Sequence, residues 1–192
     1  MNTSASERNR LAPEDWEHEA LALIAEEGVG ALSVEALARR LGVTKGSFYW
    51  HFPRRDSLLD AALARWERQG EVELLEHIAS IDDPRQRLRG LFQRVAAEVQ
   101  SHRIHAALLK ALEVTRVRIA LERAARRHLE LLAGAYRETG MPATDADNAA
   151  RLTYAAYLGF MQMNLVLGTD RLGHAEFDRY VAYLIRTLIP TA

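Results

Sequence analysis

The chain has 192 residues, of which 48% are apolar and 27% charged, and its formal net charge is -1. It has no cysteine, which excludes disulfide bonds, thiolate metal sites and a cysteine nucleophile. A total charge this close to zero also disfavours a protein that compacts nucleic acid. The first ten residues are polar and lack the apolar run of a secretion signal, so we expect a cytoplasmic protein.

Apolar residues recur at helical spacing along most of the chain, and glycine and proline are few. This pattern predicts an all-α fold of about nine helices. The first of them begins at Pro13, because proline is tolerated in a first helical turn, and ends at Gly28. Its apolar stripe consists of Trp16, Ala20, Leu23 and Ile24.

Two short helical patterns follow and meet at a glycine. Ser33 can cap the first, which extends to about Leu41, by accepting a hydrogen bond from a backbone N–H. Gly42 readily takes the left-handed conformation that ends a helix, and Thr44 can cap the second helix, residues 44–51. Pro53 then stops that helix, because the residue before a proline is pushed out of helical geometry. A helix, a tight turn and a second helix predict a helix-turn-helix.

The charge of this segment supports contact with a polyanion. From Ser33 to Arg55 there are five Lys or Arg and one acid, Glu35, so the local balance is +4. Basic groups beside a short exposed helix neutralise phosphates and release counterions, which supplies most sequence-independent DNA affinity.

Residues 20–61, with AEEGVGALSVEALARRLGVTKGSFYWHFPRRDSLLDA at their centre, resemble the DNA-binding domain of the TetR family of bacterial transcription regulators. The resemblance covers roughly a quarter of the chain. Ser33 and Trp50 stand where the family usually has Thr and Tyr. The resemblance implies a homodimer, most simply a repressor, that binds a palindromic double-stranded operator and is released by a small-molecule effector.

The resemblance also implies which residues would contact DNA: Ser33, Thr44, Lys45, Gly46, Ser47, Tyr49, Trp50, His51 and Arg55. We expect Lys45, Ser47 and Trp50 nearest the base edges, with Thr44 and either Tyr49 or His51 mainly on phosphates. Arg55 is expected on a phosphate, and the alternative is a solvated helix start. Residues 1–12, with two arginines, are either a frayed terminus or a basic arm that touches DNA.

We expect two domains, the arm and helix-turn-helix in residues 1–53 and a ligand-binding and dimerisation domain in residues 54–192. A long helix opens the second domain and could carry movements of the body to the head. Its expected inward face consists of Leu59, Ala62, Leu63 and Trp66. A loop at residues 81–84 separates it from predicted helices at 84–101, 104–113 and 116–139.

The two last predicted helices, residues 144–168 and 175–189, are expected to pair with the same helices of a second subunit. The interface candidates are Ala149, Leu152, Ala156, Gly159, Met163, Phe177, Tyr180, Val181, Leu184, Ile185 and Leu188. The alternative is that both are ordinary core helices of a monomer. Residues 152–169 carry no charge, but their polar side chains and weak basic flanks favour burial in protein over a membrane span.

A pocket for a small molecule needs aromatic and Met side chains together with a few polar groups. The candidates are Trp66, Phe92, His102, His105, Tyr136, Tyr154, Tyr157, Met161 and Gln162, and core packing is the alternative role for each. Glu98, His102 and His105 could ligate a metal on one continuous helix, but we expect a helix break near Ser101 or His102. We therefore predict no metal site.

Sequence motifs of catalysis are missing: there is no GxSxG, no phosphate-binding loop and no HExxH. We predict that the protein is not an enzyme and needs no cofactor. The alternative interpretation is an all-α small-molecule carrier or enzyme in which the helix-turn-helix is vestigial.

Overall fold

The computed structural model describes residues 11–79, 81–97, 99–167 and 174–189; the side chains of residues 70–79, 94–97, 99–100, 161, 164–167 and 174–178 are outside that description. The regular structure of the described residues is helical throughout, which confirms the all-α prediction. The elements are α1 (Pro13–Glu27), the 3-10 helix η2 (Val29–Ala31), α2 (Val34–Arg40), α3 (Lys45–Tyr49), α4 (Arg55–Ala79), α5 (Pro84–Ala97), α6 (Val99–Leu109), α7 (Thr115–Glu138), α8 (Ala143–Leu167) and α9 (His174–Leu188).

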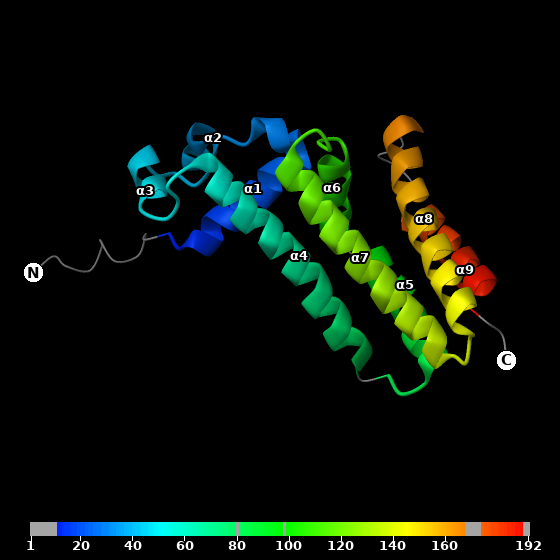
Figure 1. Ribbon diagram of the computed structural model, residues 1–192. Coiled ribbons are helices and arrows are strands. Elements are labelled where there is room, and N and C mark those ends of the chain that lie inside the picture. Colours follow the sequence, from blue (N-terminus) through cyan, green and yellow to red (C-terminus); the bar gives the residue numbers. More distant parts are fainter. Residues whose placement is uncertain (1–10, 80, 98, 168–173, 190–192) are drawn as a thin grey trace, which may run out of the picture.

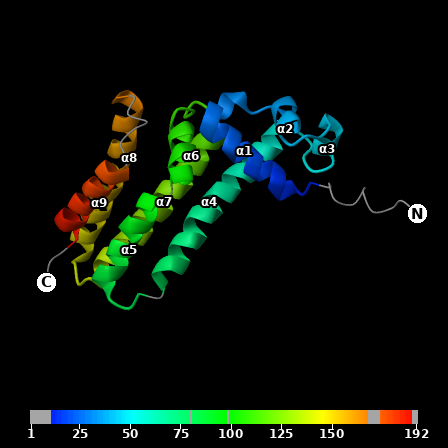
Figure 2. The same cartoon turned by 180° about the vertical axis from the view of Figure 1, so that it is seen from behind.

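Helices α1, α2 and α3 form a head at one end of an elongated molecule, and α8 and α9 lie at the other end (Figure 1). Helix α4 runs from the head along the body, beside α7. Seen from behind, α5 and α6 lie between α4 and the α8–α9 pair (Figure 2). Helix α1 packs on both α4 and α6, so the head rests directly on the body.

The larger hydrophobic core joins the head to the body. Trp16, Phe48 and Leu59 are fully buried in it, and so are Leu108 of α6 and Val117 of α7. Every residue of the predicted stripe on the first helix is buried, as are all four predicted inward residues of α4. This core contains residues from both sides of residue 53. The expected division into two domains at that residue therefore stays a prediction.

A second core fastens α5, α7, α8 and α9 to one another. Its residues are Leu88, Leu91, Ala133, Ala135, Tyr136, Ala146, Ala150 and Ile189. Inside it the Tyr136 hydroxyl lies 2.7 Å from the Thr153 Oγ1, so both buried polar groups have a partner. Burial raises the pKa of Tyr136.

The expected helix break near Ser101 and His102 is wrong. Helix α6 runs from Val99 to Leu109 and carries both His102 and His105, and the chain turns only afterwards, at residues 110–114. Serine and histidine are only mildly unfavourable inside a helix, and no glycine or proline stands there to end it. Glu98, the third residue of the considered metal site, lies outside the described residues.

The second helix of the helix-turn-helix is also shorter than expected. An α-helix forms over Lys45–Tyr49, and residues 50 and 51 continue as a turn in which the backbone N–H groups of His51 and Phe52 both donate to the Phe48 carbonyl, each at 2.9 Å. Thr44 stands at the predicted cap position, but its side chain makes no capping hydrogen bond. None of the helices in the described ranges combines the length and apolar character needed to cross a bilayer.

Candidate functional site

Local hydrogen bonds shape the turn between α2 and α3. Ser33 Oγ accepts a hydrogen bond from the Ala36 N–H at 3.2 Å and caps α2, as predicted. Gly42 has a φ of +67°, in the left-handed region that favours glycine, and the Val43 N–H donates to the Ala38 carbonyl at 2.9 Å. The chain therefore reverses within a few residues, which holds α3 at a fixed angle to α2.

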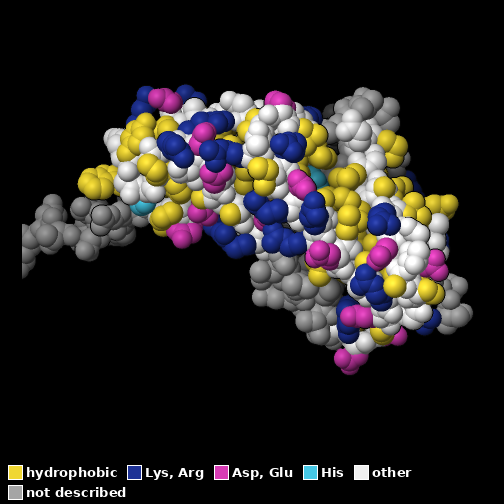
Figure 3. All heavy atoms as spheres, in the orientation of Figure 1, with side chains coloured by type: hydrophobic (Ala, Val, Ile, Leu, Met, Phe, Trp, Pro, Cys, Tyr) yellow, Lys and Arg dark blue, Asp and Glu magenta, His cyan; other side chains and the backbone are white. Residues whose placement is uncertain are grey.

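Helix α3 is anchored by one side and exposed on the other. Phe48 is fully buried, with its ring edge-on to Trp16 at 5.3 Å between centroids and beside Phe52 at 5.7 Å. The next two side chains point outward, since Tyr49 is 60% exposed and Trp50 is 86% exposed. Hydrophobic side chains project from this end of the molecule (Figure 3). Large aromatic groups left in water at a helix end are available to a partner.

The other predicted DNA contacts lie around α3. Thr44, Lys45 and Gly46 are exposed, and Ser47, His51 and Ser33 are partly exposed. A Cβ at Gly46 would meet only Thr44 Oγ1, at an ordinary 3.6 Å, so nothing inside the subunit requires glycine there.

Lys45 forms an ion pair with Glu35, the single acid of the segment. Both side chains are more than half exposed, so salt and water screen the pair and it contributes little to stability. The ammonium of Lys45 is therefore free to change partners when a phosphate approaches.

Arg55, predicted on a phosphate, is bonded inside the head. Its guanidinium donates to the carbonyls of Leu32 at 2.8 Å and Val29 at 3.0 Å, and it lies 3.3 Å from an Asp56 carboxylate oxygen. These bonds tie the first turn of α4 to the connection between α1 and α2. The structure thus gives Arg55 a bracing role that sequence alone did not predict, and the phosphate contact stays a prediction.

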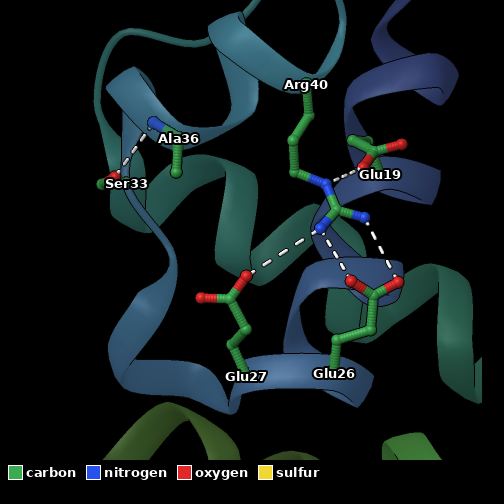
Figure 4. A network of polar contacts seen from close by, with 6 residues as sticks. All are labelled: Glu19, Glu26, Glu27, Ser33, Ala36 and Arg40. Atoms are coloured by element: carbon green, nitrogen blue, oxygen red, sulfur yellow. Dashed lines mark hydrogen bonds and ion pairs between the residues drawn. The ribbon is translucent and has the colours of Figure 1, made fainter.

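Arg40 is likewise bonded to other parts of the head, although it remains exposed to solvent. It donates to Glu19 and to both carboxylate oxygens of Glu26, at 2.7 and 3.2 Å, and lies 4.0 Å from Glu27 (Figure 4). The hydrogen bond from Arg40 lowers the pKa of Glu26. Arg40 therefore fastens α2 to α1, through three carboxylates where Lys45 has one.

A cluster of aromatic rings and histidines lies inside the body, between α4, α6, α7 and α8. His105 of α6 is buried, packs edge-on against Trp66 at 5.6 Å, and has its Nδ1 3.4 Å from the Tyr157 hydroxyl. Burial, followed by the nearby His128 and His102, lowers the pKa of His105 to about 4, so it is neutral near pH 7. Burial also raises the pKa of Tyr157.

An open groove of about 390 Å³ adjoins this cluster, between α6, α7 and α8. Its apolar lining consists of Leu109, Leu112, Leu121, Ala125 and Leu158. Its polar lining consists of His105, Arg118, Glu122 and Tyr154. The volume falls in the range of about 300 to 1,000 Å³ typical of small-molecule sites. Among the described residues no three His, Asp or Glu side chains are grouped so as to hold a metal ion.

Only two of the predicted pocket residues, His105 and Tyr154, line the groove. Trp66, His102 and Tyr157 belong to the adjoining aromatic cluster. Tyr136 of α7 lies instead in the second core, and Phe92 of α5 packs against that core. Gln162 is exposed, and the Met161 side chain is outside the description. Sequence analysis missed Arg118, Leu121, Glu122 and Ala125, whose spacing along α7 places them on one helical face.

The predicted dimer residues divide between exposed and inward positions. On α8, Leu152 is 57% and Met163 50% exposed, Gly159 is exposed, and Ala149 and Ala156 are partly exposed. On α9, Val181 is buried, while Tyr180, Leu184, Ile185 and Leu188 are partly buried. Tyr180 stacks on Phe160 with centroids 4.9 Å apart, so part of the α9 stripe holds α9 to its own subunit. The Phe177 side chain lies outside the description.

The short anchored α3, set on α2 by a glycine turn, defines a helix-turn-helix protein with a helical body. A sequence model described as bacterial regulatory proteins, tetR family, matches residues 18–62. The head of this chain, residues 18–62, is therefore of the TetR type.

Curated relatives match over the head. A class A tetracycline repressor from Escherichia coli is 44% identical over 52 residues, 27% of this chain and 24% of the relative. The regulator AcrR from Shigella flexneri is 34% identical over 80 residues, 40% of this chain and 36% of the relative. The chain thus spans between about a quarter and two fifths of the length of the curated relatives it matches.

Solved structures match over nearly the whole chain. Reduced NemR from Escherichia coli has a TM-score of 0.77 at 19% identity, covering 94% of this chain and 98% of NemR. A putative regulator from Saccharomonospora viridis, solved in complex with choline, has a TM-score of 0.77 at 20% identity, with 90% and 92% covered. At such identities the likeness concerns the fold alone.

Proposed function

We propose that the protein is a homodimeric, ligand-responsive repressor that binds a palindromic operator through α3 and leaves it when a small molecule occupies the body. The observation that carries the proposal is the split of α3 into an anchored Phe48 and an exposed surface that includes Lys45, Tyr49 and Trp50. A short helix fixed on one side and bare on the other suits insertion into the major groove.

A dimer gives this surface its selectivity. Two copies of α3 related by a twofold axis would be set about one DNA turn apart, on the order of 34 Å, and would read a palindrome. An effector that binds more tightly to a subunit arrangement with a different spacing of the two α3 helices would lower operator affinity. The loss of operator affinity cannot exceed the ratio of the effector's affinities for the two arrangements.

The test is a titration of the purified protein with labelled DNA from upstream of its own gene, followed by fluorescence anisotropy at several salt concentrations. We expect a steep loss of affinity with salt. Lys45→Ala should weaken the complex about fivefold at moderate salt and lower the slope by about one, because one positive charge that displaces counterions from the DNA is lost. Lys110→Ala, at the only other lysine of the chain and remote from α3 in the α6–α7 turn, is the matched control.

The carrier interpretation has one observation in its favour, the groove of about 390 Å³ in the body. A carrier with a vestigial head would bind small molecules but show no steep dependence of DNA binding on salt. A flat salt profile, or equal affinities of Lys45→Ala and the parent protein, would therefore contradict the repressor proposal.

A further inference from the structure

The charges at the mouth of the body groove are not balanced. Arg118 and Glu122 both line it, one turn apart on α7. Glu122 accepts a hydrogen bond from Arg126 at 2.7 Å, and that bond lowers the pKa of the Glu122 carboxyl. Arg118 is exposed and forms no ion pair with any residue that the structure describes. The charge of Arg118 also helps to lower the pKa of Glu122, but the hydrogen bond to that carboxylate comes from Arg126. Among the described residues that line the groove, Arg118 is therefore the cation whose N–H donors have no hydrogen-bonded carboxylate.

The inner wall of the groove is uncharged. Four leucines and Ala125 supply its apolar surface, and Tyr154 and His105 supply its polar atoms. His105 is neutral near pH 7, so it offers hydrogen bonds without a net charge. Burial raises the pKa of Tyr154, which keeps its hydroxyl protonated at any physiological pH.

We propose that the groove binds an amphipathic anion, with an apolar tail among the leucines and a carboxylate or similar head on the Arg118 guanidinium. This inference rests on the proposed function, since it names the chemical class of the effector. Arginine presents a planar pair of N–H donors that matches a carboxylate. A cationic head would meet Arg118 and would find the Glu122 carboxylate occupied by Arg126.

The experiment compares three ligands with the same tail: octanoate, octanol and octyltrimethylammonium, all below their micellar concentrations. Each displaces the fluorescent probe 8-anilinonaphthalene-1-sulfonate from the protein in the absence of DNA. We expect octanoate to bind at least about tenfold more tightly than either of the others, because a hydrogen bond to a charged group is worth about 1.5 to 3 kcal/mol and tenfold corresponds to about 1.4 kcal/mol.

Two substitutions locate the head and the tail. Arg118→Gln should weaken octanoate about tenfold and leave octanol unchanged, because only the charged contact is lost. Ala125→Phe should fill the groove and weaken both ligands. Lys110→Gln is the matched control: it removes one positive charge from the turn that carries Leu112 but does not line the groove, and it should bind all three ligands like the parent protein.

Three results would overturn the proposal: equal binding of the three ligands, tighter binding of the cation, or octanoate binding that survives both Arg118→Gln and Ala125→Phe. Circular dichroism of each variant shows whether it is folded, and Arg118→Gln changes only an exposed side chain. Because no DNA is present, these outcomes are independent of the operator titration. A protein that binds octanoate but no DNA would retain the inference about the groove and lose the repressor function.

Discussion

Arginines near the head differ in what they do, although they look alike in the sequence. Arg40 and Arg55 are bonded to other parts of the head, whereas Arg54, next to Arg55, is exposed. A guanidinium that holds two backbone carbonyls contributes to folding, while an exposed one is free for an external anion. The pair Arg54 and Arg55 therefore allows the two roles to be separated experimentally.

Arg55→Ala should lower the free energy of unfolding by about 1 to 3 kcal/mol, because it leaves the carbonyls of Val29 and Leu32 without their charged donor. Arg54→Ala, the control, should change it by less than about 0.5 kcal/mol. Urea unfolding followed by circular dichroism measures both. If Arg55→Ala were as stable as the parent and lost only DNA affinity, the bracing role would be wrong.

His105 makes stability depend on pH. Its pKa is about 4 in the folded protein and about 6.5 in an unfolded chain, so between these values only the unfolded state takes up the proton. The contribution of this pKa difference to the free energy of unfolding is fully present above about pH 6.5 and declines as the pH falls toward 4. It amounts to up to about 3 kcal/mol.

His105→Gln should flatten this decline, since glutamine does not titrate. The measurement is the free energy of unfolding at pH 7, 6, 5 and 4.5 for both proteins. His18→Gln, at an exposed histidine of α1, should retain the slope of the parent protein. Parallel profiles for His105→Gln and the parent would show that the decline has another origin.

At the scale of an element, the turn between α2 and α3 depends on one backbone conformation. Gly42→Ala should destabilise the protein by about 1 to 2 kcal/mol, because a side chain at a φ of +67° is strained even though a Cβ there would meet no atom within 4 Å. Gly134→Ala, also unobstructed but inside α7, should stabilise it by about 0.5 to 1 kcal/mol. Thermal unfolding of the two variants, measured side by side, should show shifts of opposite sign.

Helices were predictable from the sequence because their signals are local. The buried stripe from Trp16 to Ile24, the Ser33 cap and the stop at Gly28 all depend on residues within about two turns of one another. Apart from Asp56, which follows Arg55 directly, the partners of Arg55, Arg40 and Lys45 lie 10 to 26 positions away, and only the folded chain brings them together. The exposed surface of α3 was therefore predictable, while the ion pairs around it were not.

The groove escaped prediction for the same reason. Its walls come from α6, α7 and α8, so its lining depends on how these three helices cross. The choice of aromatic side chains and histidines included two residues that line the groove, His105 and Tyr154, but it also selected Tyr136, which packs in the second core. Charged residues such as Arg118 gave no signal, because exposed arginines are common along α7.

For the whole molecule, α7 connects the groove to the helix that carries the head. One face of α7 lines the groove, and another is tied to α4 by ion pairs from Arg116 to Asp60 and from Arg123 and Arg127 to Glu67. Dark blue Lys and Arg side chains gather along this contact (Figure 3). A ligand that shifts α7 would therefore act on α4, whose first turn is bonded to the head through Arg55.

Dimerisation is the property that would turn such a shift into a change of operator affinity, and Leu152→Glu tests it. Leu152 is 57% exposed on α8, and Met163 on the same helix is exposed to a similar extent. Tyr183 on α9, which the sequence analysis did not include among the interface candidates, is also exposed. A carboxylate buried in a twofold interface would face its own copy and repel it. We expect sedimentation to show a monomer and operator affinity to fall at least tenfold, because one head cannot hold both half-sites.

Ile119→Glu provides the matched control for that variant. Ile119 is 43% exposed on α7 and lies outside the predicted interface, so the same charge placed there should leave both the dimer and its operator affinity intact. If Ile119→Glu were the monomer and Leu152→Glu the dimer, the subunits would pair through α7 rather than α8. The separation of the two α3 helices would then be set by the surface next to the α4–α7 ion pairs, and a ligand in the groove would act on the dimer interface directly.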